Sequence, residues 1–465
     1  MDEIKNDFSQ GKMSSNILRM GIPTCIAQII NLLYSLVDRI YIGHMTENGA
    51  LALTGLGICL PVISLVTAFT NLCGQGGAPL CSMARGRGDL DEAKHIMGNS
   101  MSMLLISGVV VPTLCFAFLT PLLSFFGASE ATMPYAKNYL GIYLCGTEFV
   151  MIASGMNFHI NAQGFAKIGM ISVAIGAVLN IILDPVFIFA LGMGVQGAAL
   201  ATVISQAVSA AWVLRFLTGK KAAFTLSWRT MRLQGDTTGR ILALGAASFC
   251  FGATNSLVQM VTNHTLQTYG GDLYIGVMTV AASLRDIFMM VQRGLTQGAQ
   301  PVLSYNYGAK LYGRVRQGIN FIFRIIMAFS CVVCGFVMLC PAVLFHIYTS
   351  DAALIGAGTP MLRIYMCGFW LMGLQFVGQN TFTALGKPKQ AVFFSLLRKV
   401  FMVVPITLLL PLAIGTKGVF WAEPISDYLG ATACYATMML TVYRKLGKTG
   451  IAATVGNSKG GGQEL

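Results

Sequence analysis

Residues 176–202 read GAVLNIILDPVFIFALGMGVQGAALAT, a stretch that places a single carboxylate inside a long apolar run. An ionised Asp at the centre of a bilayer costs about 3 kcal/mol, so a residue such as Asp184 is usually kept for a function and given partners. Asn180 lies four residues earlier, on the same helical face. Pro185 lacks an N–H and leaves the carbonyl of Ile181 without its helical donor. The stretch therefore predicts a cluster of oxygen ligands inside a membrane helix.

The composition of the 465-residue chain is that of a polytopic membrane protein. Hydrophobic residues make up 55% and charged residues 11% of the chain, and the mean hydropathy is +0.68, whereas a soluble domain has about 25% charged residues. The formal net charge of +13 does not indicate nucleic-acid binding, because the basic residues are dispersed in short clusters between apolar runs. The motif Cys331-x-x-Cys334 lies in an apolar segment, which favours packing over metal or redox chemistry.

Windows of about 20 residues predict twelve transmembrane helices. The polar start of the chain and the length of the first apolar run argue against a cleavable signal peptide, so we expect the first helix to remain. The predicted spans cover residues 16–43, 52–82, 96–124, 135–162, 168–191, 195–217, 239–268, 273–304, 317–346, 354–384, 390–413 and 418–443.

The basic residues alternate from one connector to the next, which predicts the orientation in the cell membrane. Connectors on one side contain little beyond Lys137 and Lys417. By the positive-inside rule the other side and both termini are cytoplasmic, which requires an even number of spans. The basic residues on that side are Lys5, Lys12, Arg85, Arg87, Lys94, Lys167, Lys220, Lys221, Arg229, Arg232, Lys310, Arg314, Arg316, Lys387, Lys389, Arg444, Lys445 and Lys448.

Motifs of the first half of the chain recur in the second half. Gln75 to Pro79 corresponds to Gln297 to Pro301, 222 positions later, and Gly194 corresponds to Gly415. Six spans per half give parallel repeats, and we expect two pseudo-symmetric six-helix bundles around a central cavity. The predicted organisation is an N-terminal lobe at residues 1–217, a cytoplasmic linker at 218–238, a C-terminal lobe at 239–446 and a cytoplasmic tail at 447–465.

The predicted acid pair belongs to the first half alone. Asp38 lies inside the first span, and its counterpart in the seventh span is close to Thr262, while Asp184 corresponds to a position near Ile406. Two carboxylates held close together can share a proton or be neutralised by a sodium ion. Further polar groups of the same half can converge on one interior chamber, namely Tyr34, Ser154, Asn157, Asn161 and Thr202.

With these residues the chain resembles the multidrug and toxic-compound extrusion (MATE) transporters over essentially its whole length, in particular the prokaryotic DinF/MepA-like branch with an acid pair in its N-terminal lobe. One departure is the lack of an acid between Leu242 and Thr268, where other branches of the family use one. The motifs that carry the resemblance are Val37-Asp38 with Tyr41-Ile42-Gly43, Gln75-Gly76 through Arg85-Gly86, Asn180 through Asp184-Pro185, and Gly194-Val195 through Gly197-Ala198-Ala199 to Thr202.

The resemblance implies a function and a set of site residues. The function would be alternating-access export of organic cations and other xenobiotics, driven by inward Na⁺ or H⁺, without enzymatic activity or any cofactor besides the coupling ion. We expect a monomer in the lipid bilayer. The coupling site would comprise Asp38, Asn180, Asp184, Thr202 and the carbonyl of Ala198, and its polar surroundings would include Tyr34, Asn157, Tyr139 and Tyr143.

Other intramembrane residues are candidates for a substrate cavity or for structural ion pairs. Arg285 and Asp286 lie in the eighth span, and Glu423 with Asp427 forms an acidic face in the twelfth, so a pair such as Arg285 with Glu423 is an alternative to a cavity role. Met residues suit an adaptable drug pocket because they repack around different ligands. The remaining cavity candidates are Glu148, Phe158, Met289 and Met290.

Two other functional classes, a lipid flippase and a membrane-embedded enzyme, are alternatives to the exporter. A flippase of lipid-linked oligosaccharides or polysaccharides, from the same superfamily, would need a groove open to lipid and a more cationic cavity. Arg285 and Arg293 are the only obvious arginines in the middle of the spans for such a cavity. A membrane-embedded enzyme is disfavoured, because the sequence has no H-E-x-x-H motif and no G-x-S-x-G motif in a suitable context.

Overall fold

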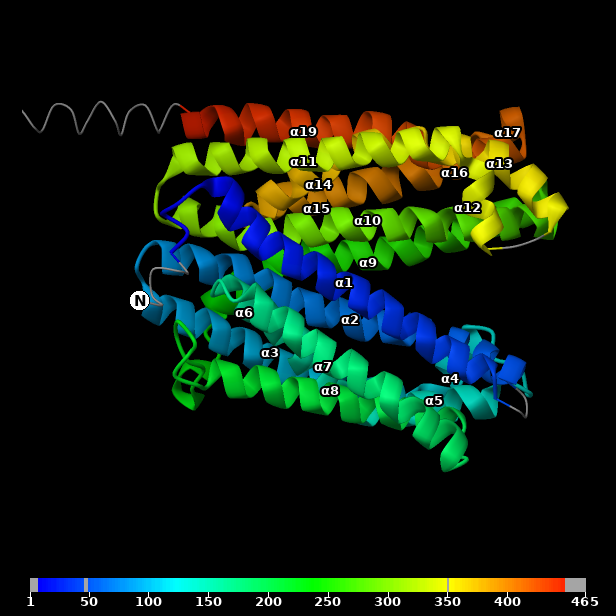
Figure 1. Ribbon diagram of the computed structural model, residues 1–465, viewed down its shortest axis with the longest axis horizontal. Helices are drawn as coiled ribbons and strands as arrows, with labels where there is room; N and C mark the ends of the chain where they lie inside the picture. Colours follow the sequence, from blue (N-terminus) through cyan, green and yellow to red (C-terminus); the bar gives the residue numbers. More distant parts are fainter. Residues whose placement is uncertain (1–6, 46–48, 349–350, 448–465) are drawn as a thin grey trace, which may run out of the picture. The chain divides into compact units, whose positions relative to one another are not determined.

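The computed structural model describes residues 7–45, 49–348 and 351–447, and every regular element within them is helical (Figure 1). Lys5, Lys448 and most of the predicted tail lie outside the described residues. The chain divides into two compact units. The N-terminal unit contains Ile22–Phe249, and the C-terminal unit contains Asp7–Gly21 together with the residues from Cys250 onward.

The first six predicted spans correspond to helices in the first half of the chain. The third span ends in a short additional helix, α4, and the fourth is bent by 57° between α5 and α6. The helices are α1 (Met13–Gly43), α2 (Gly49–Gly86), α3 (Leu90–Ala117), α4 (Leu119–Phe125), α5 (Met133–Cys145), α6 (Thr147–Ala162), α7 (Ala166–Pro185), the π-helical turn η2 (Val186–Ala190) and α8 (Val195–Leu217).

The second half repeats this pattern with more interruptions. The tenth span is bent by 41° between α13 and α14, and π-helical turns divide the last two spans. The elements are α9 (Gly235–Tyr269), α10 (Gly271–Gly308), α11 (Tyr312–Leu339), α12 (Pro341–Tyr348), α13 (Ala352–Met366), α14 (Phe369–Ala384), α15 (Pro388–Leu396), η4 (Leu397–Val403), α16 (Val404–Leu409), α17 (Pro411–Ile414), α18 (Thr416–Ser426), η5 (Asp427–Ala431), α19 (Thr432–Met438) and η6 (Met439–Tyr443).

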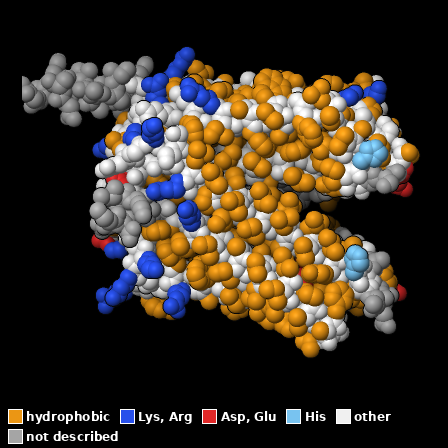
Figure 2. Space-filling model, in the orientation of Figure 1, with side chains coloured by type: hydrophobic (Ala, Val, Ile, Leu, Met, Phe, Trp, Pro, Cys, Tyr) orange, Lys and Arg blue, Asp and Glu red, His pale blue; other side chains and the backbone are white. Residues whose placement is uncertain are grey.

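These helices are suited to a membrane. Within the described residues nine helices are long and apolar enough to span a bilayer, and the two bent pairs raise the number to eleven. The remaining predicted span is the helical run from α18 to η6, so the prediction of twelve spans is consistent with the structure. Figure 2 shows hydrophobic side chains along the helices and Lys and Arg near their ends. Side chains such as Val109 (64% exposed) and Leu412 (71%) lie on the outside of the units, as expected in lipid.

The repeat is visible in the backbone where α8 and α18 begin. Gly194 has φ +56° and Gly415 has φ +60°, a left-handed conformation that only glycine adopts readily. Three residues further on, a Cβ at Gly197 would lie 2.7 Å from the backbone of Phe187, and a Cβ at Gly418 would lie 2.6 Å from the nitrogen of Pro411. In both halves a glycine pair therefore lets the sixth helix turn back tightly against the end of the fifth.

The predicted linker is hydrogen-bonded to the N-terminal unit. Oδ1 of the fully buried Asn99 accepts from the backbone N–H of Gln234 at 2.8 Å, and Nδ2 of Asn99 donates to the carbonyl of Arg232 at 3.3 Å. Oε1 of Gln163 accepts from the backbone N–H of Ala223 at 2.9 Å. The short 3₁₀ turn η3 (Trp228–Met231) lies between these two anchors. These hydrogen bonds therefore make the linker an ordered part of the N-terminal unit.

We expect Asn99→Ala to loosen the linker, because a buried N–H and a buried carbonyl would lose their partner at a cost of about 1–3 kcal/mol. The melting temperature of the purified protein in detergent should fall, and limited proteolysis within residues 218–234 should accelerate. Thr238→Val is the matched control, because it removes only the 3.3 Å bond from Thr238 Oγ1 to the same Asn99 oxygen. Equal proteolysis of both variants and the parent protein would contradict this view of the linker.

Candidate functional site

The structure brings four of the predicted coupling residues together in the N-terminal unit. Asn180 and Asp184 lie on α7, Thr202 lies on α8, and Asp38 lies on α1. Nδ2 of Asn180 donates to Oδ1 of Asp184 at 3.2 Å and to Oγ1 of Thr202 at 3.4 Å. Asp184, Asn180 and Asp38 are 0%, 2% and 8% exposed. The Asn180 amide therefore links the fifth span to the sixth through Thr202 and also holds the carboxylate of Asp184 on its own helix.

Asp38 is the second acid of this cluster. Its carboxylate is close enough to Asp184 for the two to interact electrostatically, and Tyr34 on α1 interacts with both. No described residue donates a hydrogen bond to Oδ1 of Asp38, Oδ2 of Asp184 or Oδ1 of Asn180, although all three oxygens are buried. A buried acceptor without a donor is costly, so these three oxygens are suited to accept a proton, a water molecule or a small cation.

The residues of the cluster fit a small hard cation such as Na⁺. Carboxylate, amide and hydroxyl oxygens are the ligands that hard cations prefer. Ala198 lies one turn before Thr202 on α8 and is fully buried, so its carbonyl is part of the same helical turn. The π-helical turn η2 starts directly after Pro185, and such turns are frequent at functional sites.

Three tyrosines lie close to one another near the acid pair. Tyr139 and Tyr143 are buried on α5, and their rings stack with centroids 6.3 Å apart. Tyr139 interacts electrostatically with both Asp38 and Tyr34. Tyr34 and Tyr139 therefore lie near the acids, and Tyr143 lies next to these two tyrosines. Each hydroxyl can donate or accept a hydrogen bond.

Asn157 lies away from this cluster. Its Nδ2 donates to the carbonyl of Gly169 at 2.9 Å and to Oγ of Ser172 at 2.7 Å. Both partners belong to the first turns of α7, eight or more residues before Asn180. Asn157 thus joins α6 to α7, a common use of amides between membrane helices, and the expectation that it surrounds the coupling site receives no contact in its support.

The two cavity candidates on α6 differ in their surroundings. Both carboxylate oxygens of Glu148 are buried without a described hydrogen-bond partner, and the side chain packs so closely on α3 that a Cβ at Gly108 would overlap it. Among the described residues no Arg pairs with Glu148, which was the expected alternative. Phe158 is half-buried beside Asn157 on the same helix.

The C-terminal unit buries a second cluster of charged residues. Nη2 of Arg285 on α10 lies 3.3 Å from Oε2 of Glu423 and 2.6 Å from Oδ2 of Asp427, so the predicted ion pair forms. Nη1 of Arg398 lies 3.2 Å from Oε2 of Glu423 and 2.7 Å from Oδ1 of Asp427. Nζ of Lys399 lies 2.6 Å from Oε1 of Glu423. Three cations thus share two carboxylates.

Arg398 and Lys399 were not predicted from the sequence. The expectation that Arg285 and Arg293 are the only obvious arginines in the middle of the spans is wrong, because Arg398 is also buried inside a span. Both missed residues lie in the π-helical turn η4, within the eleventh predicted span. Two adjacent basic residues inside an apolar run require buried acids nearby, and the i, i+4 pair Glu423 and Asp427 was the signal that could have found them.

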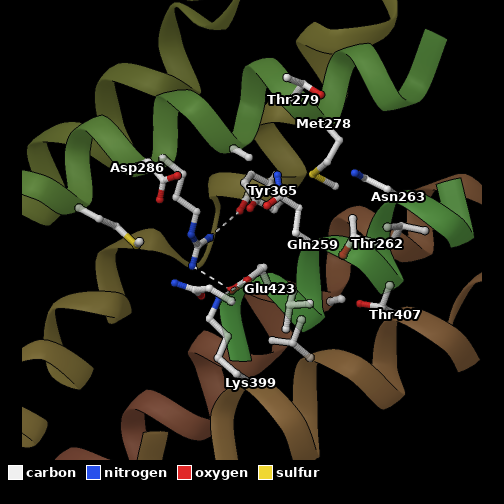
Figure 3. Close-up of a pocket in the computed structure, with 18 residues that line it drawn as sticks. Gln259, Thr262, Asn263, Met278, Thr279, Asp286, Tyr365, Lys399, Thr407 and Glu423 are labelled. Carbon is white, nitrogen blue, oxygen red and sulfur yellow. Dashed lines mark hydrogen bonds and ion pairs between the residues drawn. The ribbon is translucent and has the colours of Figure 1, made fainter. Parts of the chain in front are cut away.

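The charged cluster borders a pocket that lies wholly within the C-terminal unit (Figure 3). Its cavity volume is about 160 Å³. Four of the predicted cavity residues line it, namely Arg285, Asp286, Met289 and Glu423, whereas Met290 does not. The sequence analysis missed its polar wall on α9, which consists of Asn255, Gln259, Thr262 and Asn263.

Two repeats of six membrane helices, each with a buried cluster of charged groups, define a polytopic membrane transporter. A comparison with family models gives the family. The MatE model matches residues 23–186 and 249–409, and the chain belongs to the MatE family, whose members are transporters and not enzymes.

Curated relatives and solved structures agree with this assignment. The chain is 24% identical over 442 residues to the multidrug export protein MepA of Staphylococcus saprophyticus, with 95% of this chain and 96% of that protein covered. It is 23% identical over 442 residues to MepA of Staphylococcus aureus, with the same coverage. An outward-facing structure of a multidrug resistance MATE family transporter is similar with a TM-score of 0.88 at 22% identity, covering 95% of this chain and 98% of that chain.

The charge count of the C-terminal cluster predicts unequal effects of two substitutions. Asp427→Asn would leave one carboxylate for three cations, and we expect a loss of about 3–5 kcal/mol, as is usual when a buried pair loses one partner. Arg398→Gln would leave two cations for two carboxylates, so its effect on the melting temperature in detergent should be clearly smaller. Arg324→Gln, at an exposed position, is the control. Equal destabilisation by the first two substitutions would contradict the charge count.

Proposed function

We propose that this chain exports organic cations and related xenobiotics across the cell membrane in exchange for Na⁺ or H⁺. The observation that carries the proposal is the set of three buried, donorless oxygens on Asp38, Asp184 and Asn180. The names of the curated relatives, which describe multidrug export proteins, support the substrate class. In this proposal both termini are cytoplasmic, the chain acts as a monomer, and it exchanges substrate with the bilayer and the two aqueous sides.

The coupling follows from charge in a medium of low polarity. With Asp38 and Asp184 both ionised, the buried cluster carries two negative charges, and uptake of a proton or Na⁺ removes one of them. Coulomb interactions are much stronger away from water, so this uptake reduces the attraction for an organic cation in the same lobe. Two cations that compete for one negative site are bound alternately, and that reciprocity is the thermodynamic basis of antiport.

Local structure gives the ion a means of moving helices. Asp38 is on α1, Asn180 and Asp184 are on α7, and Thr202 is on α8, so an ion held by all of them draws three helices together. Pro185 and the turn η2 interrupt the regular hydrogen bonding of the fifth span, which makes bending there less costly. Release of the ion leaves two carboxylates that repel one another, and the helices separate again.

The alternative function as a lipid-linked saccharide flippase has less support. Such a flippase would need unpaired cations for a pyrophosphate group. Arg285, Arg398 and Lys399 each pair with Glu423 or Asp427, so most of their charge is already neutralised. Accumulation of ethidium in cells with and without the protein separates the two functions.

Replacement of either acid should stop coupled export. In proteoliposomes with an imposed ion gradient, we expect Asp38→Asn and Asp184→Asn each to reduce ethidium efflux at least tenfold, because each variant loses a charged ligand for the ion and half of the negative charge that attracts both cations. Asp91→Asn is the matched control, since Asp91 is exposed and pairs only with Lys94 on the surface of α3. Unchanged efflux in either cluster variant would remove the basis of the proposal.

The same assay identifies the coupling ion. Replacing sodium by choline at fixed pH should abolish efflux if Na⁺ is the ion, and should leave it intact if H⁺ is. Thr202→Val gives an independent readout, because loss of a neutral ligand oxygen should raise the sodium concentration for half-maximal efflux but should change a proton-driven process little. Efflux that persists without either gradient would exclude antiport.

A further inference from the structure

The pocket of the C-terminal unit carries positive charge on one side. Lys399 and Arg285 line it, and both belong to the cluster in which three cations share two carboxylates, so that cluster has one positive charge in excess. Lys399 donates one described hydrogen bond, to Oε1 of Glu423. A Lys ammonium has three donors, so two remain for a bound molecule.

The pocket also contains one carboxylate that forms no ion pair with any described residue. Asp286 is exposed, follows Arg285 on α10 and lines the pocket. Asp286 interacts electrostatically with Arg293 and Tyr365, and the Arg293 guanidinium lies 5.0 Å from the ring centroid of Phe251. Asp286 is therefore available to a cationic group that enters the pocket.

The remaining polar wall is neutral. Asn255, Gln259 and Asn263 follow one another at helical spacing on α9 and line the pocket. None of the three side-chain amides is hydrogen-bonded to a described residue. Each amide offers both donors and an acceptor, which suits the polar atoms of a ligand that carries its two charges at different places.

We propose that this pocket binds zwitterionic compounds, with the ligand's ammonium group at Asp286 and its carboxylate at Lys399 and Arg285. A cavity of about 160 Å³ is large enough for the charged end of an amino acid-like molecule, whose bulkier part stays at the open side. The inference deepens the proposed function and rests on it, since it extends the exported compounds from simple organic cations to molecules of zero net charge. Opposite charges on two sides of one pocket disfavour ligands that carry only one of them, because the other wall group then loses solvation without gaining a partner.

Three fluorescent probes that differ only in charge test the proposal. Nε-dansyl-lysine is a zwitterion, its methyl ester is a cation and its Nα-acetyl derivative is an anion. Fluorescence anisotropy with the purified, full-length protein, at mildly acidic pH where the ester stays protonated, gives the three affinities. We expect the zwitterion to bind at least tenfold more tightly than either derivative.

Two substitutions assign the ends of the ligand. Asp286→Asn should remove the preference for the zwitterion over the anion, and Lys399→Met should remove the preference for the zwitterion over the cationic ester. Lys399→Met leaves two cations for two carboxylates, so we expect the cluster to tolerate it, and Asp286→Asn provides an independent variant outside the cluster. Asp272→Asn, at an exposed position in the first turn of the same helix α10, is the control and should keep the full preference.

Probe binding and ethidium export can succeed or fail independently, because binding is measured without an ion gradient. If all three probes bind the parent protein equally, or if both pocket variants keep the preference, the inference is wrong even where ethidium export is intact. If Asp38→Asn and Asp184→Asn leave export unchanged while the zwitterion preference depends on Asp286 and Lys399, the coupling scheme fails and the pocket assignment stands.

Discussion

The cost of placing charge inside a bilayer governs this structure. Each unit buries acids among apolar helices, and each meets that cost differently. In the N-terminal unit Asp38 and Asp184 lie together with an amide and a hydroxyl, and several oxygens have no described donor. In the C-terminal unit Glu423 and Asp427 are held by two arginines and a lysine. The first arrangement suits the mobile cation that we propose, and the second has fixed cationic side chains.

This difference gives the two repeats different tasks within one architecture. Gly194 and Gly415 turn the chain in the same way, and Gly197 and Gly418 make the same close approach, so the backbone of the repeat is preserved. The charged residues are not preserved, because Asp184 corresponds to a position near Ile406 and Asp38 to one near Thr262. The proposed exchange site in one lobe and a cluster whose acids have fixed cationic partners in the other can thus share one fold.

The number of spans and part of the candidate site could be predicted from the sequence. Apolar runs of about 20 residues and the recurrence of motifs 222 positions apart predicted twelve spans. Helical spacing predicted Asn180 as a partner of Asp184, whereas Thr202, on another helix, was assigned to the site through the resemblance to the MATE family. Three features could not be predicted in this way. Asn157 has a side chain that could bind a cation, yet its amide donates hydrogen bonds to Gly169 and Ser172 in the first turns of α7, away from Asp184. The orientation of α6 in the bundle determines this partner, and the sequence does not show it.

The other two depend on packing between helices. Arg398 and Lys399 were not singled out from the sequence, and their ion pairs with the acids of the twelfth span are evident only in the structure. The polar wall on α9 was not predicted, and only the pocket shows that Asn255, Gln259 and Asn263 remain accessible. Sequence periodicity gives the face of a helix, but the partner of that face comes from tertiary structure.

The central claim is that Asp38 and Asp184 take up one small cation as a single unit. Infrared difference spectroscopy of the purified protein in lipid tests it most directly, with the carboxylate bands recorded as sodium is added at fixed pH and as the pH is changed without sodium. The account predicts one carboxylate signal that responds to one of these ions and disappears in both Asp38→Asn and Asp184→Asn. A signal that survives in either variant, or two independent signals that each vanish in only one, would contradict it.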